Sequence, residues 1–400
     1  MKKGNMKYLF FWLVMFTVCT GNAQQLYDGS IKPADATPAK YLHLLQGKSV
    51  GLIINQTSRI GDKNLLDLLL ERKVNVRKIF VPEHGFRGKE DAGAKVDNST
   101  DSATGLPVIS LYGKHKQPTA EDIKDIDVLV YDLQDVGVRF YTYISTMEYC
   151  MTACAENHKQ FIVLDRPNPN GFYVDGPVLT KDNKSFVGMQ CVPVVYGMTA
   201  GEYARMLKGE NLADKLKTLD LQVVKCINYN HKKKYELPVA PSPNLRTMAA
   251  VYAYPSLCLF EGTPISVGRG TPLPFQRFGC PEFEGKFADS FIPKSSEGAK
   301  SPPFENKVCY GEVIGKDAKE VLEKLGSRFK LNWLISAYNA YPVKDKFFTG
   351  FFVKLCGTAT LQQQITSGVS EDAIRASWKS DIKAFKQVRK KYLLYEDFEK

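Results

Sequence analysis

The 400-residue sequence lacks several of the patterns by which a function is often recognised. After residue 24, no apolar stretch approaches the roughly 18 residues that a membrane-spanning helix needs. No GxGxxG follows the first predicted strand, so we do not expect a dinucleotide. The cysteines show no paired CxxC spacing, which argues against a structural zinc site. We therefore expect no metal, no cofactor and no integral membrane segment in the mature chain.

Nine cysteines are present, and only Cys19 falls within the first 23 residues. The other eight are scattered between Cys150 and Cys356, most of them in apolar runs. We expect them to be mostly buried free thiols, with at most one disulfide, which an exported protein could form.

Residues 1–23 have the pattern of a secretory signal peptide. Three lysines precede an apolar centre from Tyr8 to Val18, and small residues then lead to a predicted cut after Ala23. A lipid anchor at Cys19 is the less favoured alternative, because Val18 stands where a small residue is expected. We expect an exported protein, periplasmic or secreted.

The formal charge is +11, and three of the lysines lie in that first segment. The hydrophobic content of 44% and charged content of 24% are those of a globular protein. Basic clusters such as 231–234 and 389–391 are best read as solvated surface. Nucleic-acid binding would need basic residues interleaved with aromatics on one face, so we expect no nucleic-acid partner. Attraction to an anionic substrate or envelope polymer is the alternative.

Apolar strands alternate with helices in the first half of the chain. The predicted strands are 49–56, 76–85, 106–113, 127–135, 161–171 and 221–229, and the main helices are 64–72, a short one from 118, and 144–157. A capping box at Thr199 and Glu202 starts another helix. Continuous apolar strands separated by helices are typical of a parallel sheet covered on both faces. We predict a Rossmann-like, doubly wound α/β domain over residues 40–232.

From about residue 235 the chain becomes rich in proline, glycine and aromatics, as in rigid loops that line pockets. A strand at 308–314 and helices at 317–329, 331–341 and 371–391 follow. We predict a smaller α+β domain over residues 233–400.

Four predicted strands end in polar residues. These are Asn55 and Gln56, then Glu83 and His84, then Asp132, Gln134 and Asp135, then Asp165, Arg166 and Asn168. Any one of them could cap a helix or brace a loop. Since ligands of such sheets bind beyond the carboxyl ends of the strands, the four together indicate a shared site.

Several stretches resemble one bacterial family in their order and spacing. They are PEHGFRG, TGLPVISLYG, DVLVYDLQDVGVRFYTYISTM, FIVLDRPNPNG, PSPN, LFEGTPISVGRGT and RKKYLLY. This family is the exo-β-N-acetylmuramidases, which remove N-acetylmuramic acid from the non-reducing end of peptidoglycan fragments. The resemblance runs from about residue 40 to the end, and only residues 284–306 do not align with it. It implies a Rossmann-like domain, a smaller C-terminal domain and a cleft between them.

The resemblance implies hydrolysis of a β-glycosidic bond, which usually needs a carboxylic acid and a second group that attacks or activates water. Glu83 is the first candidate for the acid, and His84 could tune it or bind substrate. Asp135, Asp132 and Glu261 are the candidates for the second carboxylate, and the residues do not choose among them. Substrate-assisted attack by the N-acetyl group would need no protein nucleophile.

The expected substrate is a peptidoglycan-derived sugar whose lactyl carboxylate an arginine could bind in bidentate fashion. The candidates for this are Arg87, Arg139, Arg166 and Arg269. Tyr141 and Tyr143, with Phe275, could stack on sugar faces. Asn55, Gln134, Asp165, Asn168 and Asn244 complete the predicted substrate-binding residues.

Two other functions remain open at this stage. A non-catalytic envelope-sugar binding protein would use many of the same groups. An envelope esterase or amidase would need a nucleophilic serine, usually on a GxSxG turn between a strand and a helix. No such turn is predicted, and five histidines leave few partners for it.

Overall fold

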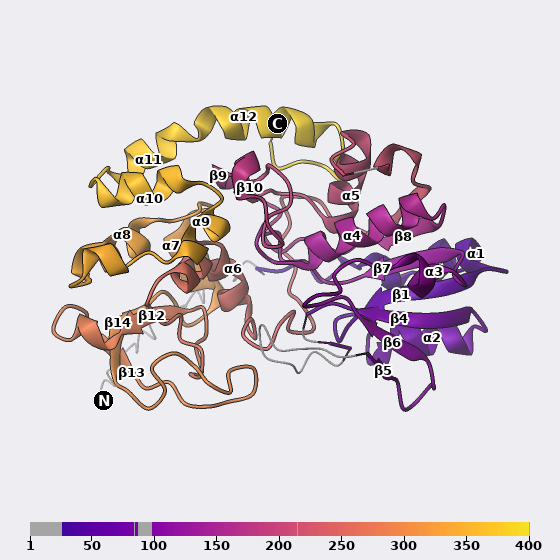
Figure 1. Ribbon diagram of the computed structural model, residues 1–400, viewed down its shortest axis with the longest axis horizontal. Coiled ribbons are helices and arrows are strands. Elements are labelled where there is room, and N and C mark those ends of the chain that lie inside the picture. Colours follow the sequence, from indigo (N-terminus) through magenta and orange to yellow (C-terminus); the bar gives the residue numbers. More distant parts are fainter. Residues whose placement is uncertain (1–25, 84, 87–97, 214, 400) are drawn as a thin grey trace, which may run out of the picture.

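A seven-stranded sheet organises the first half of the chain in the computed structural model, which describes residues 26–83, 85–86, 98–213 and 215–399 (Figure 1). The strands are β1 (Ser49–Ile54), β4 (Asn75–Val81), β5 (Ser99–Thr100), β6 (Pro107–Ser110), β7 (Val128–Asp132), β8 (Gln160–Leu164) and β11 (Leu221–Val224). Their order is β11-β8-β7-β1-β4-β6-β5, parallel except for the β5–β6 pair. The chain runs outward from β1 to β6, returns beside β1 as β7, and runs outward again. The predicted doubly wound α/β fold is confirmed.

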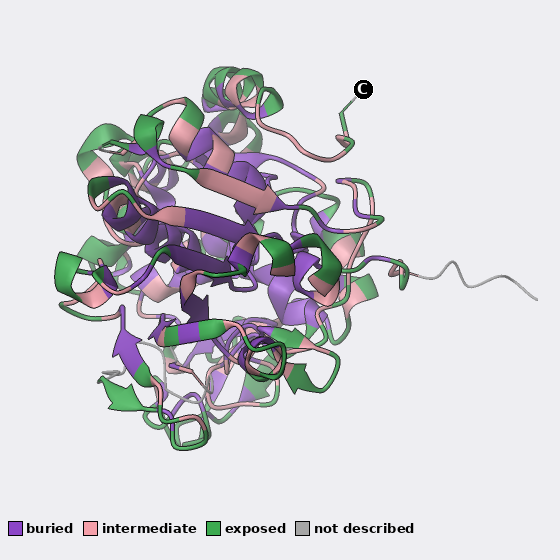
Figure 2. Ribbon diagram, turned by 90° about the vertical axis from the view of Figure 1, so that its right-hand side faces the viewer, coloured by how far each residue is buried: buried purple, intermediate pink, exposed green. Residues whose placement is uncertain are grey.

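Helices cover both faces of this sheet because its strands are apolar on both sides. Leu52 and Ile54 pack into one core with the residues of α2 (Leu65–Glu71). Ile53 points the other way, into a second core with α4 (Tyr143–Glu156) and α5 (Ala200–Gly209). Successive strand residues alternate between faces, so the continuous apolar pattern feeds two cores. Figure 2 shows the buried strands inside and the exposed residues on the outer helices and loops.

The second half builds a smaller, mainly helical domain around a three-stranded antiparallel sheet of order β12-β14-β13. Its strands are β12 (Arg277–Cys280), β13 (Asp289–Phe291) and β14 (Cys309–Val313). Its helices are α6 (Met248–Leu257), α7 (Ala318–Leu325), α8 (Asn332–Ala340), α9 (Gly350–Cys356), α10 (Ala359–Thr366), α11 (Glu371–Ser377) and α12 (Lys379–Lys390). The remaining elements are α1 (Leu42–Leu45), β2 (Arg59–Ile60), β3 (Lys63–Asn64), α3 (Ala120–Ile123), β9 (Asp175–Val178) and β10 (Pro193–Val195).

Several sequence predictions for elements need correction. The sequence predicts no helix at α6, because every residue of α6 is buried and the helix has no polar face. The predicted helix 371–391 is two helices, α11 and α12, which meet at Trp378. The predicted helix 317–329 ends at Leu325, where Gly326 takes a left-handed conformation with φ 58°. The capping box of Thr199 and Glu202 at the start of α5 is confirmed.

The eight cysteines in the described part of the chain are all free, in line with the expected free thiols, and the one disulfide that the sequence allowed is not formed among them. Seven of them are buried, as predicted, and Cys191 is exposed. Within the described ranges, no helix combines the length and apolar character needed to cross a membrane.

The end of the chain returns to the first domain. Figure 1 shows α12 extending from the second domain toward α5. The Tyr395 hydroxyl then donates to Oδ2 of Asp165 over 2.7 Å, and the Leu394 backbone N–H donates to Glu202 over 2.8 Å. These bonds tie both domains together on the side of α5.

Candidate active site between the domains

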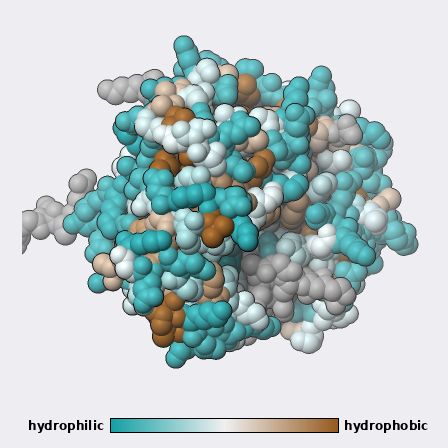
Figure 3. Space-filling view, turned by 60° about the vertical axis from the view of Figure 1, so that its left-hand side comes forward, coloured by the Kyte–Doolittle hydropathy of each residue, from teal (hydrophilic) through white to brown (hydrophobic). Residues whose placement is uncertain are grey.

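A cavity of about 390 Å³ lies between the two domains, with walls from both. The first domain contributes Glu83, Tyr112, Phe140, Tyr141, Thr142, Tyr143, Phe186 and Val187. The second contributes Ser242, Leu245, Tyr254, Cys258, Glu261, Arg269, Phe275, Phe351 and Leu355. Figure 3 shows a largely hydrophilic face with a central hollow and isolated apolar residues around it. Glu83, Tyr112 and residues 140–143 follow β4, β6 and β7 near the point where the strand order reverses, which is where such sheets bind ligands. Phe186 and Val187 come from the segment after β9.

Glu83 reaches the cavity from the loop that follows β4. The hydroxyl of Tyr112, which follows the neighbouring strand β6, donates to Oε1 of Glu83 over 3.1 Å. Burial raises the pKa of Tyr112, and so does the nearby Glu83 carboxylate, so this hydroxyl stays a donor. His84 and Arg87, two further predicted site residues, lie outside the described residues.

Glu261 reaches the cavity from the second domain, on the turn after α6, and is paired with Arg269. Nε and Nη2 of Arg269 donate to Oε1 of Glu261 over 3.0 and 2.7 Å. The guanidinium also lies 5.0 Å from the ring centre of Phe275, close enough for a cation–π contact. Glu261 raises the pKa of Arg269 against the opposing effect of burial, so the arginine is charged.

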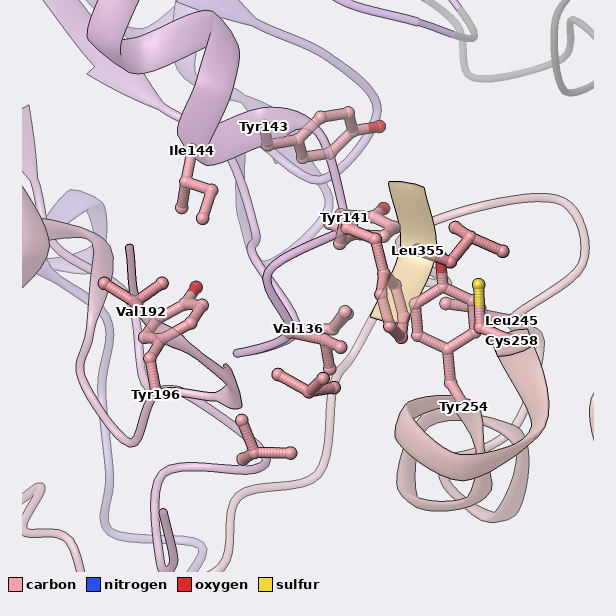
Figure 4. Packing of buried hydrophobic residues seen from close by; sticks show 14 of the residues in the cluster. Val136, Tyr141, Tyr143, Ile144, Val192, Tyr196, Leu245, Tyr254, Cys258 and Leu355 are labelled. Atoms are coloured by element: carbon pink, nitrogen blue, oxygen red, sulfur yellow. The ribbon is translucent and has the colours of Figure 1, made fainter. Parts of the chain in front are cut away.

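Tyr141 and Tyr143 form part of the cavity wall, and their hydroxyls hold a loop of the second domain. The Pro241 carbonyl accepts from Tyr141 over 2.8 Å and from Tyr143 over 3.4 Å. Asn55, fully buried, donates to the Tyr143 hydroxyl over 2.9 Å. Figure 4 shows Tyr141 beside Tyr254, Cys258 and Leu355 of the second domain. Asn55 therefore acts on the site through Tyr143 rather than by lining the cavity.

Asp132 and Arg166 belong to a buried ion cluster that does not line the cavity. Arg166 bonds Asp132 over 2.6 Å and Asp35 over 2.5 Å, and all three side chains are almost completely buried. Burial raises the pKa of Asp35 to about 7, and Arg166 opposes that rise. Because the cluster is enclosed, its geometry favours a structural role for both predicted residues.

The other polar strand ends also bond within the protein. Oδ2 of Asp135 accepts from the Gly137 N–H over 2.7 Å and from the Tyr196 hydroxyl, and burial raises its pKa to about 6. Gln134 donates to the carbonyls of Asp135 and Pro167. Asp165 accepts from Thr199 and from the Gly201 N–H at the start of α5.

Asn168, Asn244 and Arg139 are likewise bonded to backbone groups. Asn168 donates to the Met198 carbonyl and Asn244 to the Gly298 carbonyl, each over 2.7 Å. Arg139, which is 1% exposed, donates to four carbonyls at 2.7–3.0 Å, namely Pro177, Val192, Leu355 and Cys356. None of these three lines the cavity. Of the predicted site residues that are described, the structure brings Glu83, Tyr141, Tyr143, Glu261 and Arg269 together there.

Sequence reasoning missed Tyr112, Tyr254, Phe186 and Phe351. Tyr112 follows β6 by two residues, so the rule that selected the other strand ends could have selected it. Tyr254 lies on α6, which was not predicted, and nothing in the sequence distinguishes Phe186 or Phe351 from core phenylalanines.

Two further observations concern a metal site and a nucleophilic serine. Among the described residues, no group of three or more His, Cys, Asp or Glu is placed to hold a metal ion. The letters GxSxG do occur at 47–51, contrary to expectation. However, Ser49 is the first residue of β1 and lies at the amino end of the sheet, away from the cavity, so it is no nucleophile elbow.

Comparison with known proteins gives one consistent family. Residues 50–249 match the model described as exo-beta-N-acetylmuramidase NamZ, N-terminal, and residues 252–395 match its C-terminal counterpart. The peptidoglycan beta-N-acetylmuramidase NamZ of Bacillus subtilis (strain 168) is 39% identical over 373 residues, which cover 89% of each chain.

Two crystal structures of DUF1343 family proteins from Bacteroides fragilis NCTC 9343 have the same fold. One has a TM-score of 0.85 at 45% identity and the other 0.73 at 31%, and each comparison covers 92% of this chain and 99% of the other.

Replacement of Arg139 by methionine should destabilise the fold rather than alter a binding site. Four buried carbonyls would lose their donor, and we expect the free energy of unfolding to fall by about 3 kcal/mol or more. Urea unfolding measures this. Arg77→Met, at a half-exposed arginine 3.8 Å from Asp125, is the control and should change stability by less than about 0.5 kcal/mol. Unchanged stability of Arg139→Met would refute the structural role.

The cluster of Asp35, Asp132 and Arg166 should make stability fall as pH rises. The folded chain keeps a proton on Asp35 up to about pH 7, whereas the unfolded carboxyl loses it near 3.8. Between these values the folded state binds more protons, so its stability declines with pH. In Asp35→Asn this decline should shrink by up to about 4 kcal/mol between pH 4 and 8, since each unit of pKa shift corresponds to about 1.4 kcal/mol, and urea unfolding measures it. Parallel curves for variant and wild type would contradict the assignment.

Proposed function

The chain belongs to the exo-beta-N-acetylmuramidase NamZ family, and on this premise we propose that it is a glycoside hydrolase that releases N-acetylmuramic acid from peptidoglycan fragments. The observation that carries the proposal is that Glu83 and Glu261 line one cavity from different domains. A pair of carboxylates flanking a sugar is the usual arrangement for hydrolysis of a glycosidic bond.

Glu83 is the general acid, which protonates the oxygen of the leaving sugar. Its Oε1 accepts the Tyr112 hydroxyl over 3.1 Å, and this bond fixes the carboxyl group. A fixed acid within reach of the leaving oxygen contributes through proton transfer in the transition state.

Glu261 is the second carboxylate. Arg269 donates to its Oε1 twice, which holds the group in one orientation. A carboxylate in that place can stabilise the positive charge that develops on the sugar ring, and can direct water or the N-acetyl group to the reacting carbon. Asp132 and Asp135, the other two candidates, are buried in bonds of their own.

Arg269 also recognises the lactyl carboxylate that distinguishes N-acetylmuramic acid from N-acetylglucosamine. Within the described residues, Nη1 of Arg269 makes no hydrogen bond, whereas Nε and Nη2 are used by Glu261. Its charge and this remaining donor suit an anionic group on the substrate. Arg139 and Arg166 are enclosed elsewhere, and Arg87 lies outside the described residues.

We also propose that the protein is exported. The basic start, short apolar centre and small residues of positions 1–23 support secretion across the cytoplasmic membrane, beyond which peptidoglycan lies.

Two substrates with different leaving groups test the roles of the glutamates. Glu83→Gln should lower kcat/KM for the disaccharide N-acetylmuramyl-β-1,4-N-acetylglucosamine by about 10²–10⁴-fold, the usual contribution of a general acid. Its loss on 4-nitrophenyl β-N-acetylmuramide should be much smaller, because nitrophenolate leaves without protonation. Tyr112→Phe should behave in the same way but more mildly.

Glu261→Gln should instead lose activity on both substrates alike, since its role does not depend on the leaving group. Glu121→Gln, at an exposed glutamate with 76% of its side chain accessible, is the control and should leave both rates unchanged. Equal losses by Glu83→Gln on the two substrates would refute its assignment as the acid. No release by the wild-type protein from either substrate would refute the proposed function.

The specificity role of Arg269 is tested by product inhibition, which does not depend on turnover of a poor substrate. The wild-type enzyme should bind free N-acetylmuramic acid more tightly than N-acetylglucosamine. Arg269→Met should reduce that ratio of inhibition constants by about tenfold or more, and Arg269→Lys by less, because lysine keeps the charge without the planar fork. If Arg269→Met weakened the binding of both sugars equally, Arg269 would only hold Glu261 in position.

A further inference from the structure

Among the described residues that line the cavity, Phe351 alone is exposed, so it marks the mouth. Four large hydrophobic side chains in the described ranges are more than 40% exposed, namely Ile292, Val308, Val343 and Phe351. Only Phe351, at 41%, belongs to the cavity. Single exposed hydrophobic residues are common, so its position rather than its exposure is informative.

Phe351 is not needed to pack α9. The neighbouring Phe352 is fully buried, with its ring centre 4.4 Å from that of Phe348. Leu355 follows Phe351 by four residues and therefore lies on the same face of the helix. Both line the cavity, so α9 presents an apolar ridge to it.

This ridge is fixed relative to the second glutamate. The Thr349 N–H and hydroxyl, just before α9, donate to the Gly262 carbonyl over 2.9 and 3.0 Å. Gly262 follows Glu261, and a Cβ on it would come within 2.4 Å of the Phe352 Cα, so the two backbones are in close contact. Phe351 therefore holds a set position with respect to Glu261.

The first domain supplies a second aromatic group to the cavity. Phe186 is partly buried, and its ring stacks on that of Tyr149 with 6.2 Å between the ring centres. The Nζ atom of Lys116 lies 4.6 Å from the ring centre of Phe186. Val187 adjoins it. The cavity thus joins a polar part, with Glu83, Glu261 and Arg269, to apolar groups from both domains.

In an exo-acting hydrolase, the terminal sugar occupies the polar part and the rest of the fragment must pass out through the mouth. The C–H face of a pyranose packs well on an aromatic ring. We propose that Phe351, with Phe186 of the first domain, forms a binding site for the first sugar on the leaving side of the scissile bond. This inference rests on the proposed function and adds a subsite that selects saccharide over simple leaving groups.

The test compares Phe351→Ala on the disaccharide and on 4-nitrophenyl β-N-acetylmuramide, whose departure depends little on contacts to the leaving group. We expect kcat/KM for the disaccharide to fall about tenfold, as for one well-packed aromatic contact, and that for the nitrophenyl substrate to fall less than about threefold. Phe351→Trp should restore the disaccharide activity. Val343→Ala, at another hydrophobic residue with 41% exposure, is the matched control and should change neither.

The possible outcomes separate the inference from its premise. Equal losses on both substrates, or no loss on the disaccharide, would overturn the subsite while leaving the hydrolase intact. A wild-type protein that cleaves neither substrate would overturn the premise itself. Thermal unfolding of Phe351→Ala should match that of wild type, because the residue is exposed.

Discussion

The candidate active site depends on Arg139, a buried arginine that joins the two domains through backbone carbonyls. Its guanidinium bonds Pro177 and Val192 of the first domain and Leu355 and Cys356 at the end of α9. No carboxylate compensates its charge among these partners, and burial lowers its pKa to about 10, so it remains protonated at neutral pH. The dipole at the carboxyl end of α9 favours a cation there. Since α9 also carries Phe351 and Leu355, this contact positions one wall of the cavity.

The polar residues at the ends of the strands have two different roles: some stabilise the fold, and others line the cavity. Asp132, Asp165 and their neighbours are enclosed and satisfied by arginine, hydroxyl and N–H donors, as buried polar groups must be. Their bonds fix the loops that follow β7 and β8. Glu83 differs because it lines the cavity that residues of the second domain also line. The same edge therefore provides both the support and one carboxylate of the candidate site.

Much of the fold could be predicted from the sequence, because apolar strands and capped helices are local patterns. The site could be predicted only in outline. Glu83 was the first candidate for the acid, but Glu261 and Arg269 stood beside Asp132 and Arg166 with equal claims, since all four follow apolar segments or lie in glycine-rich motifs. What separates them is burial and pairing, which arise from contacts far apart in the chain, such as that between Asp35 and Arg166. The same limit applies to α6. Because all of its residues are buried, its sequence shows no alternation of apolar and polar residues at the helical period, and the helix could not be predicted.

The two glutamates come from different domains, so their separation is not a property of the sheet. It is set by how the second domain sits on the first, through Arg139 and through the bonds from Tyr141 and Tyr143 to Pro241. In glycoside hydrolases this separation decides whether a water molecule fits between sugar and carboxylate, and hence the stereochemical outcome. A change at the interface can therefore alter the reaction without touching either glutamate, because it moves one carboxylate relative to the other. If the two glutamates act as proposed, the contacts between the domains therefore decide the stereochemical outcome.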